Sequence, residues 1–259
     1  MHNFFPNFDN IIFFDVETTG LNPMKDQIIE FAAMKFTKEG ACDETHFYIQ
    51  LENGRTLPEE ITELTGIYTE WLEKRGICME EAMTKIKQVL FGPGTTNLLI
   101  AHNANFDMRF VLKMMSDAGF DKLCTKSHVL DSLTVARDRK EHPCKLKDMI
   151  THYHITGVEN SHRAIDDVFA LAKVVHAMGT ECNDLDLYVN LFGMYPRFPT
   201  PEAEKILGIT YVIQNYEGGK NRRLYLIERE KGIKPHGTPE EEVYGDIEDE
   251  YLARCEGRI

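Results

Sequence analysis

Two carboxylates stand two residues apart at the end of an apolar segment near the N-terminus. The segment is Ile11-Ile12-Phe13-Phe14, and Asp15 and Glu17 follow it, before Thr18-Thr19-Gly20. Side chains at i and i+2 of a β-strand point to the same face, so the two carboxylates converge. Like charges on a core strand repel each other unless a cation lies between them. The pair predicts a site for a hard divalent metal such as Mg²⁺ or Mn²⁺; two solvated acids at a strand end are the alternative.

Two further segments carry acids that could face a cleft. The first is His102-Asn103-Ala104-Asn105-Phe106-Asp107, in which Asp107 lies in the first turn of an expected helix. There a carboxylate either caps the helix or faces the cleft. The second is Ser161-His162-Arg163-Ala164-Ile165-Asp166-Asp167, with Ser161 expected as a helix N-cap. His162 and Asp167 would lie about 140° apart around that helix, where they can flank one cleft.

The hydrophobic pattern predicts the elements that position these residues. After the first strand we expect strands over residues 27–36 and 45–51, with short connections that imply an antiparallel meander. Further strands are expected over residues 97–103 and 129–133, and the second of these is expected to run into a helix. Helices are expected over residues 59–64, 80–91, 104–118, 145–153 and 162–178. Three antiparallel strands followed by strand–helix units predict an α/β domain over residues 1–180, with a mixed sheet flanked by helices.

Residues 181–259 predict a small C-terminal extension. Residues 195–201 form a proline-rich connector, and residues 209–213 and 224–227 flank a Gly-Gly segment in the pattern of a β-hairpin. An isolated hairpin is marginal in water, so we expect it to pack on the main domain. The segment from Thr238 onward is acidic and poor in aliphatic residues, which predicts a mobile acidic tail.

The composition restricts the class of protein. No apolar run approaches the length of a membrane span, and the N-terminus lacks the features of a secretory signal, so we expect a cytoplasmic protein without membrane contact. The formal net charge is −13. Residues 237–259 hold eight acids and two arginines, so −6 of this charge lies in the tail. Bound divalent cations would offset further acids, so the charge does not exclude a phosphate-bearing substrate.

Together the three motifs resemble those of the DEDD superfamily of 3′–5′ exonucleases. They read Asp-x-Glu-Thr-Thr-Gly, His-Asn-Ala-x-Phe-Asp and His-x-Ala-x-x-Asp in this order, and the resemblance covers roughly residues 8–180. The histidine of the third motif is that of the DEDDh branch, which includes the proofreading epsilon subunit of DNA polymerase III, ribonuclease T and oligoribonuclease. The resemblance implies a ribonuclease H-like fold with a mixed five-stranded sheet.

The resemblance also implies the catalytic roles. Asp15 would bridge two divalent ions, Mg²⁺ or Mn²⁺, Glu17 and Asp167 would bind the first ion, and Asp107 would bind the second. Such ions activate a water and neutralise the charge that develops during phosphodiester hydrolysis. His162 would be the general base, since an imidazole titrates near the working pH; a histidine near a helix cap is the alternative.

Substrate contacts follow by the same resemblance. The residues that would meet the terminal nucleotide are Thr18, Thr19, Leu21, His102, Asn103 and Phe106. For Leu21 and Phe106, ordinary core packing competes with contact to a base. Asp131, which also matches a recurrent family feature, is interpreted as a structural N-cap.

The expected function is a metal-dependent 3′–5′ exonuclease, similar to the epsilon subunit, that releases nucleoside 5′-monophosphates. Nucleic-acid 3′ ends are the expected partners, DNA first and RNA second, with a DNA polymerase subunit as a further candidate. An RNA-trimming or oligoribonucleotide-degrading enzyme is the alternative. It would need the same four acids and His162, because the 2′-hydroxyl takes no part in the hydrolysis. A non-catalytic adaptor for nucleic acid or a polymerase is the third hypothesis, and intact acids argue against it.

Overall fold

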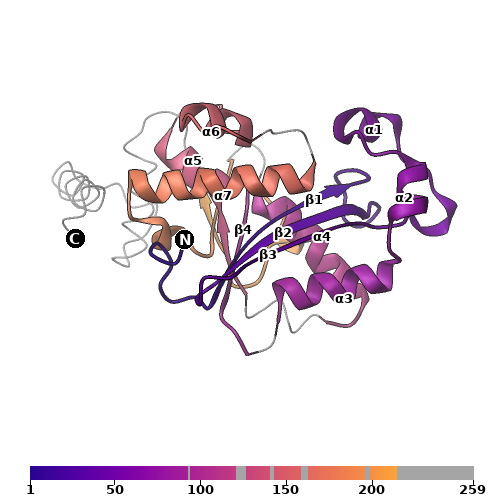
Figure 1. The fold of residues 1–259 in the computed structure, drawn as a ribbon, viewed down its shortest axis with the longest axis horizontal. Helices are drawn as coiled ribbons and strands as arrows, with labels where there is room; N and C mark the ends of the chain where they lie inside the picture. The colour runs from indigo at the N-terminus through magenta and orange to yellow at the C-terminus, as the bar shows by residue number, and fades with distance from the viewer. Residues whose placement is uncertain (93, 121–126, 141–142, 159–162, 196–198, 215–259) are drawn as a thin grey trace.

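A five-stranded mixed sheet lies at the centre of the fold (Figure 1). The computed structural model describes residues 1–92, 94–120, 127–140, 143–158, 163–195 and 199–214. Within these residues the sheet has the strand order β3-β2-β1-β4-β5. Its strands are β1 (Asn10–Thr18), β2 (Ile28–Thr37), β3 (Cys42–Tyr48), β4 (Asn97–Ala101) and β5 (His128–Asp131).

The strand directions follow from the lengths of the connections. The strands β1, β2 and β3 pair antiparallel, whereas β4 pairs parallel with both β1 and β5. Short turns can join only antiparallel neighbours, and parallel neighbours need a crossover that is usually helical. The predicted meander and the mixed sheet are confirmed. The strand β1 becomes the middle strand, and its residues 11–14 are fully buried.

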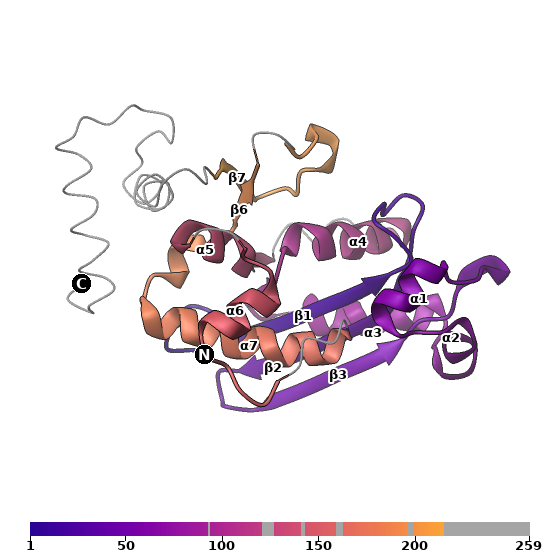
Figure 2. The ribbon, with the colours of Figure 1, turned by 90° about the horizontal axis from the view of Figure 1, so that it is seen from above.

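Helices cover both faces of the sheet (Figure 2). Alternate residues of β1 belong to two clusters: Ile11 and Phe13 pack with α5, α6 and α7, whereas Ile12, Phe14 and Val16 pack with α3 and α4. The helices are α1 (Glu59–Thr65), α2 (Thr69–Arg75), α3 (Met79–Leu90), α4 (Ala104–Asp117), α5 (Ser132–Arg139), α6 (Leu146–His152) and α7 (Ala164–Glu181), with short 3₁₀ turns η1 (Glu52–Gly54), η3 (Leu185–Tyr188) and η4 (Glu202–Glu204).

Most helix positions agree with the sequence pattern, and two differ. The helix α2 was not predicted, because it is one short segment in which only Leu72 is buried, too little to produce a helical period. The helix α7 begins at Ala164 with Arg163 in the N-cap position, so the expected cap by Ser161 is wrong. Ser161 itself lies outside the described residues. None of the described helices is long and apolar enough to span a membrane.

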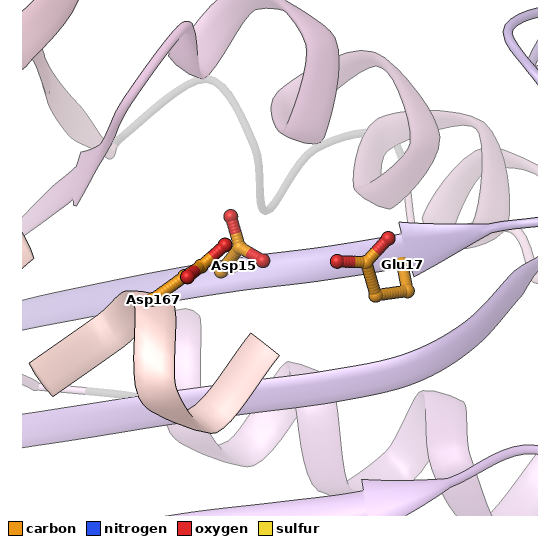
Figure 3. A group of neighbouring side chains, drawn as sticks. All are labelled: Asp15, Glu17 and Asp167. Carbon is orange, nitrogen blue, oxygen red and sulfur yellow. The ribbon is translucent and has the colours of Figure 1, made fainter. Parts of the chain in front are cut away.

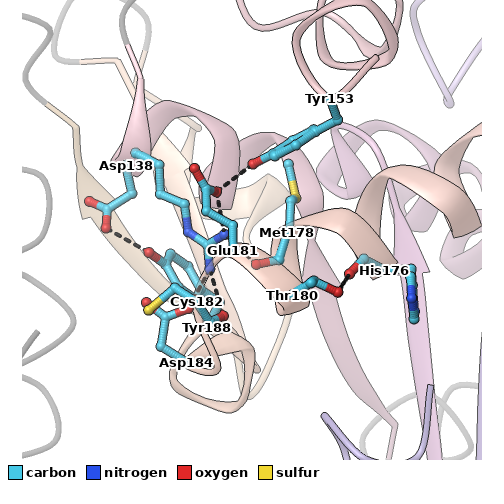
Figure 4. A network of polar contacts seen from close by, with 10 residues as sticks. Asp138, Tyr153, His176, Met178, Thr180, Glu181, Cys182, Asp184 and Tyr188 are labelled. Atoms are coloured by element: carbon cyan, nitrogen blue, oxygen red, sulfur yellow. Dashed lines mark hydrogen bonds and ion pairs between the residues drawn. The ribbon is translucent and has the colours of Figure 1, made fainter. Parts of the chain in front are cut away.

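Residues 182–195 pack on the sheet domain through buried polar contacts (Figure 4). The guanidinium of Arg139 in α5 donates to the backbone oxygen of Met178 at 2.7 Å and forms ion pairs with Glu181 and Asp184. The hydroxyl of Tyr188, which is fully buried, donates to the Asp138 carboxylate at 2.7 Å. A segment that contributes such buried partners is part of the packed structure.

The start of the predicted hairpin forms a different pairing. The strand β7 (Thr210–Ile213) pairs parallel with β6 (Leu191–Met194), which was not predicted from the sequence. The second strand of the hairpin, residues 224–227, and the acidic tail lie outside the described residues. The hairpin and the division of the chain at residue 180 stay predictions.

Asp131, the last residue of β5, binds the starts of both α4 and α5. One carboxylate oxygen accepts the backbone N–H groups of Asn103 and Ala104 at 2.8 and 3.1 Å, and also that of Leu133. The other accepts the N–H and the hydroxyl of Thr134. The structure thus confirms Asp131 as the N-cap of α5 and adds a second role, since the same carboxylate fixes the start of α4.

We expect Asp131→Ala to lower the free energy of unfolding by about 3 kcal/mol, because several buried N–H groups lose their acceptor at once. Urea denaturation measures this. The matched control is Asp117→Ala in α4, an exposed carboxylate whose ion-pair partner among the described residues is Lys113, and this change should cost about 0.5 kcal/mol. Equal losses in the two variants would contradict the double capping role.

Candidate functional site

Three carboxylates meet on the face of the sheet that α7 covers (Figure 3). Asp15 and Glu17 project from β1 toward α7, on the same face as Ile11 and Phe13. Asp167 projects from the first turn of α7. One carboxylate oxygen from each of the three lies within 4.8 Å of the other two. The structure thus brings these three predicted ligands together, and their role as metal ligands stays a prediction.

Asp107 approaches the same strand from the start of α4. Its carboxylate accepts the backbone N–H of Val16 at 3.2 Å, and the residue is only 3% exposed. Val16 lies between Asp15 and Glu17 in the chain, so this hydrogen bond joins α4 to β1 at the acidic pair. Asp107 is not a member of the three-acid group, yet its charge acts on the pKa of both Asp15 and Glu17.

Burial and mutual repulsion raise the pKa values of these acids. Desolvation raises the pKa of Glu17 to about 8, with further contributions from Glu30, Asp167 and Asp107. The pKa of Asp107 is also raised to about 8, chiefly by burial. Burial, followed by the charge of Asp107, raises the pKa of Asp15 well above its usual range. Without a cation the group therefore resists ionisation near neutral pH.

A fourth acid on this face, Glu30 of β2, was missed by the sequence analysis. It is fully buried and lies directly opposite Glu17 in the antiparallel register. The available signal was a glutamate within the apolar run of residues 28–34. Its carboxylate contacts the Arg163 guanidinium at 3.4 Å and accepts the Ala164 N–H at 3.4 Å. Glu30 therefore accepts a backbone N–H at the start of α7, which is the capping role that we expected of Ser161.

The Thr-Thr-Gly turn after β1 is held by its own hydrogen bonds. The hydroxyl of Thr18 donates to the Gly20 oxygen at 2.6 Å, and the Thr19 hydroxyl donates to Asp26 at 3.2 Å. A Cβ at residue 20 would lie 2.6 Å from the Asp26 carboxylate, so a larger residue would have to displace this carboxylate from its hydrogen bonds with Thr19 and Asn22. Leu21 is 81% exposed, which disfavours the core-packing alternative for this side chain.

The second motif forms a tight turn between β4 and α4. His102 uses both ring nitrogens, one with the Ser132 hydroxyl at 2.9 Å and one with the Cys144 backbone oxygen at 3.0 Å. Burial lowers the pKa of His102. Asn103 adopts a left-handed conformation with φ of 70° and is exposed. Phe106 is half-buried, with its ring 5.1 Å from that of Phe110, so it has both a packed side and an accessible side.

His162, the proposed general base, lies outside the described residues. It directly precedes Arg163 in the chain, and Arg163 is the N-cap of the helix that carries Asp167. Its role stays a prediction.

The described residues fit a divalent cation. The donors are carboxylate oxygens, which Mg²⁺ and Mn²⁺ prefer. In the described parts of the chain, no lysine or arginine forms an ion pair with Asp15 or Glu17. Partly buried acids without a compensating cation are costly unless they are protonated or bind a metal.

The sheet order, with acids on its middle strand, is the arrangement of a ribonuclease H-like fold. Residues 12–175 match the model of the RNase_T exonuclease family. This match covers more than half of the chain, so the protein belongs to that family. The family and the fold implied by the three motifs are confirmed.

Relatives and solved structures agree with this assignment. The chain is 32% identical to the PolC-type DNA polymerase III of Clostridium perfringens over 168 residues, and 33% identical to that of Thermotoga maritima over 230 residues. The two alignments include 64% and 87% of this chain but only 11% and 16% of the two relatives. E. coli exonuclease I in complex with a dA16 oligonucleotide is similar in fold, with a TM-score of 0.58 and 19% identity, over 66% of this chain and 41% of that one.

We expect the metal-free protein to lose stability as the pH rises from about 5 to about 8. The folded-state pKa values of Glu17 and Asp107 lie above their usual values, so the native state holds protons that the unfolded state has already released. This stabilisation is complete below the unfolded-state pKa and is lost as the pH rises through the folded-state pKa, by about 1.4 kcal/mol per pH unit for each proton.

Urea denaturation in EDTA across this pH range measures the loss. Millimolar Mn²⁺ should remove most of the slope, and Glu17→Gln should make the slope in EDTA shallower. A metal-free protein that is equally stable at both ends of the range would contradict the assignment of the raised pKa values.

Proposed function

We propose that this protein is a metal-dependent 3′–5′ exonuclease that releases nucleoside 5′-monophosphates, with DNA as its first substrate. The observation that supports it most is the convergence of Asp15, Glu17 and Asp167 within 4.8 Å, beside Asp107. Family membership supports the reaction class. The DNA polymerase relatives and the oligonucleotide-bound fold neighbours support DNA over RNA.

Each acid has a role in this proposal. Asp15, Glu17 and Asp167 would hold one Mg²⁺ or Mn²⁺, and Asp107 would help Asp15 to hold a second. Bound divalent ions supply a water of lowered pKa and positive charge that stabilises the pentacoordinate phosphate and the leaving 3′-oxygen. His162 takes the proton from the attacking water, for which a neutral imidazole is suited.

Residues near the acids are proposed to position the 3′ end of the nucleic acid. The turn at Thr18 and Thr19 is rigid, because its hydroxyls and backbone groups bond within the turn and to Asp26 and Gln27. The exposed Leu21 and the accessible side of Phe106 offer apolar surfaces to the terminal base. His102 contributes its ring surface, since both of its nitrogens are already engaged. Asn103 is exposed beside it and can offer its amide to the sugar or phosphate.

The relation to a polymerase is a further part of the proposal. The chain resembles only a small share of the PolC-type DNA polymerases III. This similarity supports a nuclease that works beside a DNA polymerase subunit, and co-purification with tagged full-length chain would identify such a subunit.

A time course on 5′-labelled single-stranded DNA and RNA of the same sequence tests the reaction. We expect a ladder that shortens from the 3′ end of DNA with Mg²⁺, slower cleavage of RNA, and none in EDTA. Asp15→Asn should lower the rate by about 10³-fold or more, because the shared ligand of both ions loses its charge. His162→Ala should lower the rate most at neutral pH, where the base is needed.

The matched control is Asp9→Asn, a half-buried acid directly before β1 that accepts the backbone N–H of Thr96, and this variant should retain the wild-type rate. Faster cleavage of RNA would assign the enzyme to the RNA-trimming class with the same site. Binding of both nucleic acids without cleavage, with Mn²⁺ also present, would contradict the enzyme and support the adaptor.

A further inference from the structure

Glu30 makes an unusual set of contacts for a buried glutamate in a central sheet. Besides Arg163 and the Ala164 N–H, it bonds the Nε2 atom of His46 in β3 at 2.7 Å. These partners come from β3 and from the start of α7, so the carboxylate is bound from two sides. A hydrophobic residue of similar volume would be expected to stabilise a sheet at least as well. The ion pair therefore calls for an explanation beyond packing.

The position of Arg163 supplies an explanation for the buried ion pair. Its guanidinium lies between Glu30, the hydroxyl of Tyr48, and the rings of Tyr48 and Trp71 at 5.6 and 6.0 Å. Glu30 lies opposite Glu17 in the register, so this cation stands one strand away from the acidic pair of β1. It is close enough for its charge to act on Glu17, although it forms no ion pair with it.

Arg163 is therefore a potential competitor for the metal. A guanidinium binds carboxylates strongly and in a bidentate manner. If it turned from Glu30 to Glu17, it would occupy the place of a divalent ion. Arg163 precedes Ala164 and lies four residues before Asp167, so its backbone is fixed next to the acids by α7.

We propose that Glu30 is a positioning residue that retains the Arg163 guanidinium beside Tyr48 and Trp71, and so keeps Asp15, Glu17 and Asp167 open to a divalent cation. The inference rests on the proposed metal-dependent function and adds to it a residue outside the three motifs. This role explains why Glu30 is buried next to acids that it repels. Arg163 neutralises the charge of Glu30, and Glu30 in turn keeps Arg163 away from the metal ligands.

The test measures Mn²⁺ dissociation constants of the full chain by electron paramagnetic resonance, at one mildly alkaline pH, without any substrate. In Glu30→Gln the side chain keeps its shape and an acceptor for the Ala164 N–H, but it loses the charge that retains Arg163. We expect Mn²⁺ to bind about tenfold more weakly, the usual size of such outer contacts to a metal site. Exposed Glu44 on β3 gives the matched charge control, and Glu44→Gln should bind as the wild type does.

The double variant separates this account from a purely structural role. In Glu30→Gln/Arg163→Gln the competitor is gone, so the affinity should return to within about threefold of the wild type. A structural role for the ion pair predicts that the double variant binds no better than Glu30→Gln. Arg163→Gln alone should bind Mn²⁺ at least as tightly as the wild type, and a tenfold weaker affinity there would overturn the proposal even if Glu30→Gln failed to fold.

The outcomes distinguish this inference from the function on which it rests. If the wild type binds Mn²⁺ and degrades DNA while Glu30→Gln binds Mn²⁺ equally well, the role of Glu30 is wrong and the nuclease stands. If the wild type binds no Mn²⁺, the proposed function fails, and the inference fails with it.

Discussion

Repulsion among partly buried carboxylates on one face of the sheet is the constraint that the functional site imposes on this fold. Asp15 and Glu17 must point the same way because they are two residues apart on one strand, and Asp167 approaches them from α7. Desolvation and mutual charge raise the pKa of Glu17 to about 8. This arrangement lowers the stability of the metal-free fold. A bound cation would relieve the repulsion, so the same arrangement favours cation binding.

Carboxylates on neighbouring strands support the site by accepting backbone N–H groups at the starts of the helices that carry Asp107 and Asp167. Asp131 accepts N–H groups from the starts of α4 and α5, which fixes the turn that leads to Asp107. Glu30 accepts an N–H at the start of α7 and contacts Arg163, one turn before Asp167. Both helices that carry site acids therefore begin at a carboxylate donated by a neighbouring strand. Loss of either contact would leave the acid of that helix less well positioned.

The sequence allowed the prediction of those features that depend on local pattern. The period of two along β1 determined which acids share a face, and the helical period located α3, α4 and α7 to within a few residues. What it did not reveal depends on distant contacts. Glu30 appeared as one polar residue in a strand, because its partner Arg163 lies 133 residues further along the chain. A different reason applies to β6: it has only four residues, which carry little periodic signal, so its parallel pairing with β7, a strand that the sequence did predict, was missed.

Anomalous diffraction from crystals grown with Mn²⁺ would test the central claim, that the acidic cluster is a metal site, most directly. We expect an anomalous peak bonded to carboxylate oxygens of Asp15, Glu17 and Asp167, and a second peak between Asp15 and Asp107. The Mn–oxygen distances should be about 2.2 Å, as for hard divalent cations. A cluster without any peak at saturating Mn²⁺, or one filled by the Arg163 guanidinium, would contradict it.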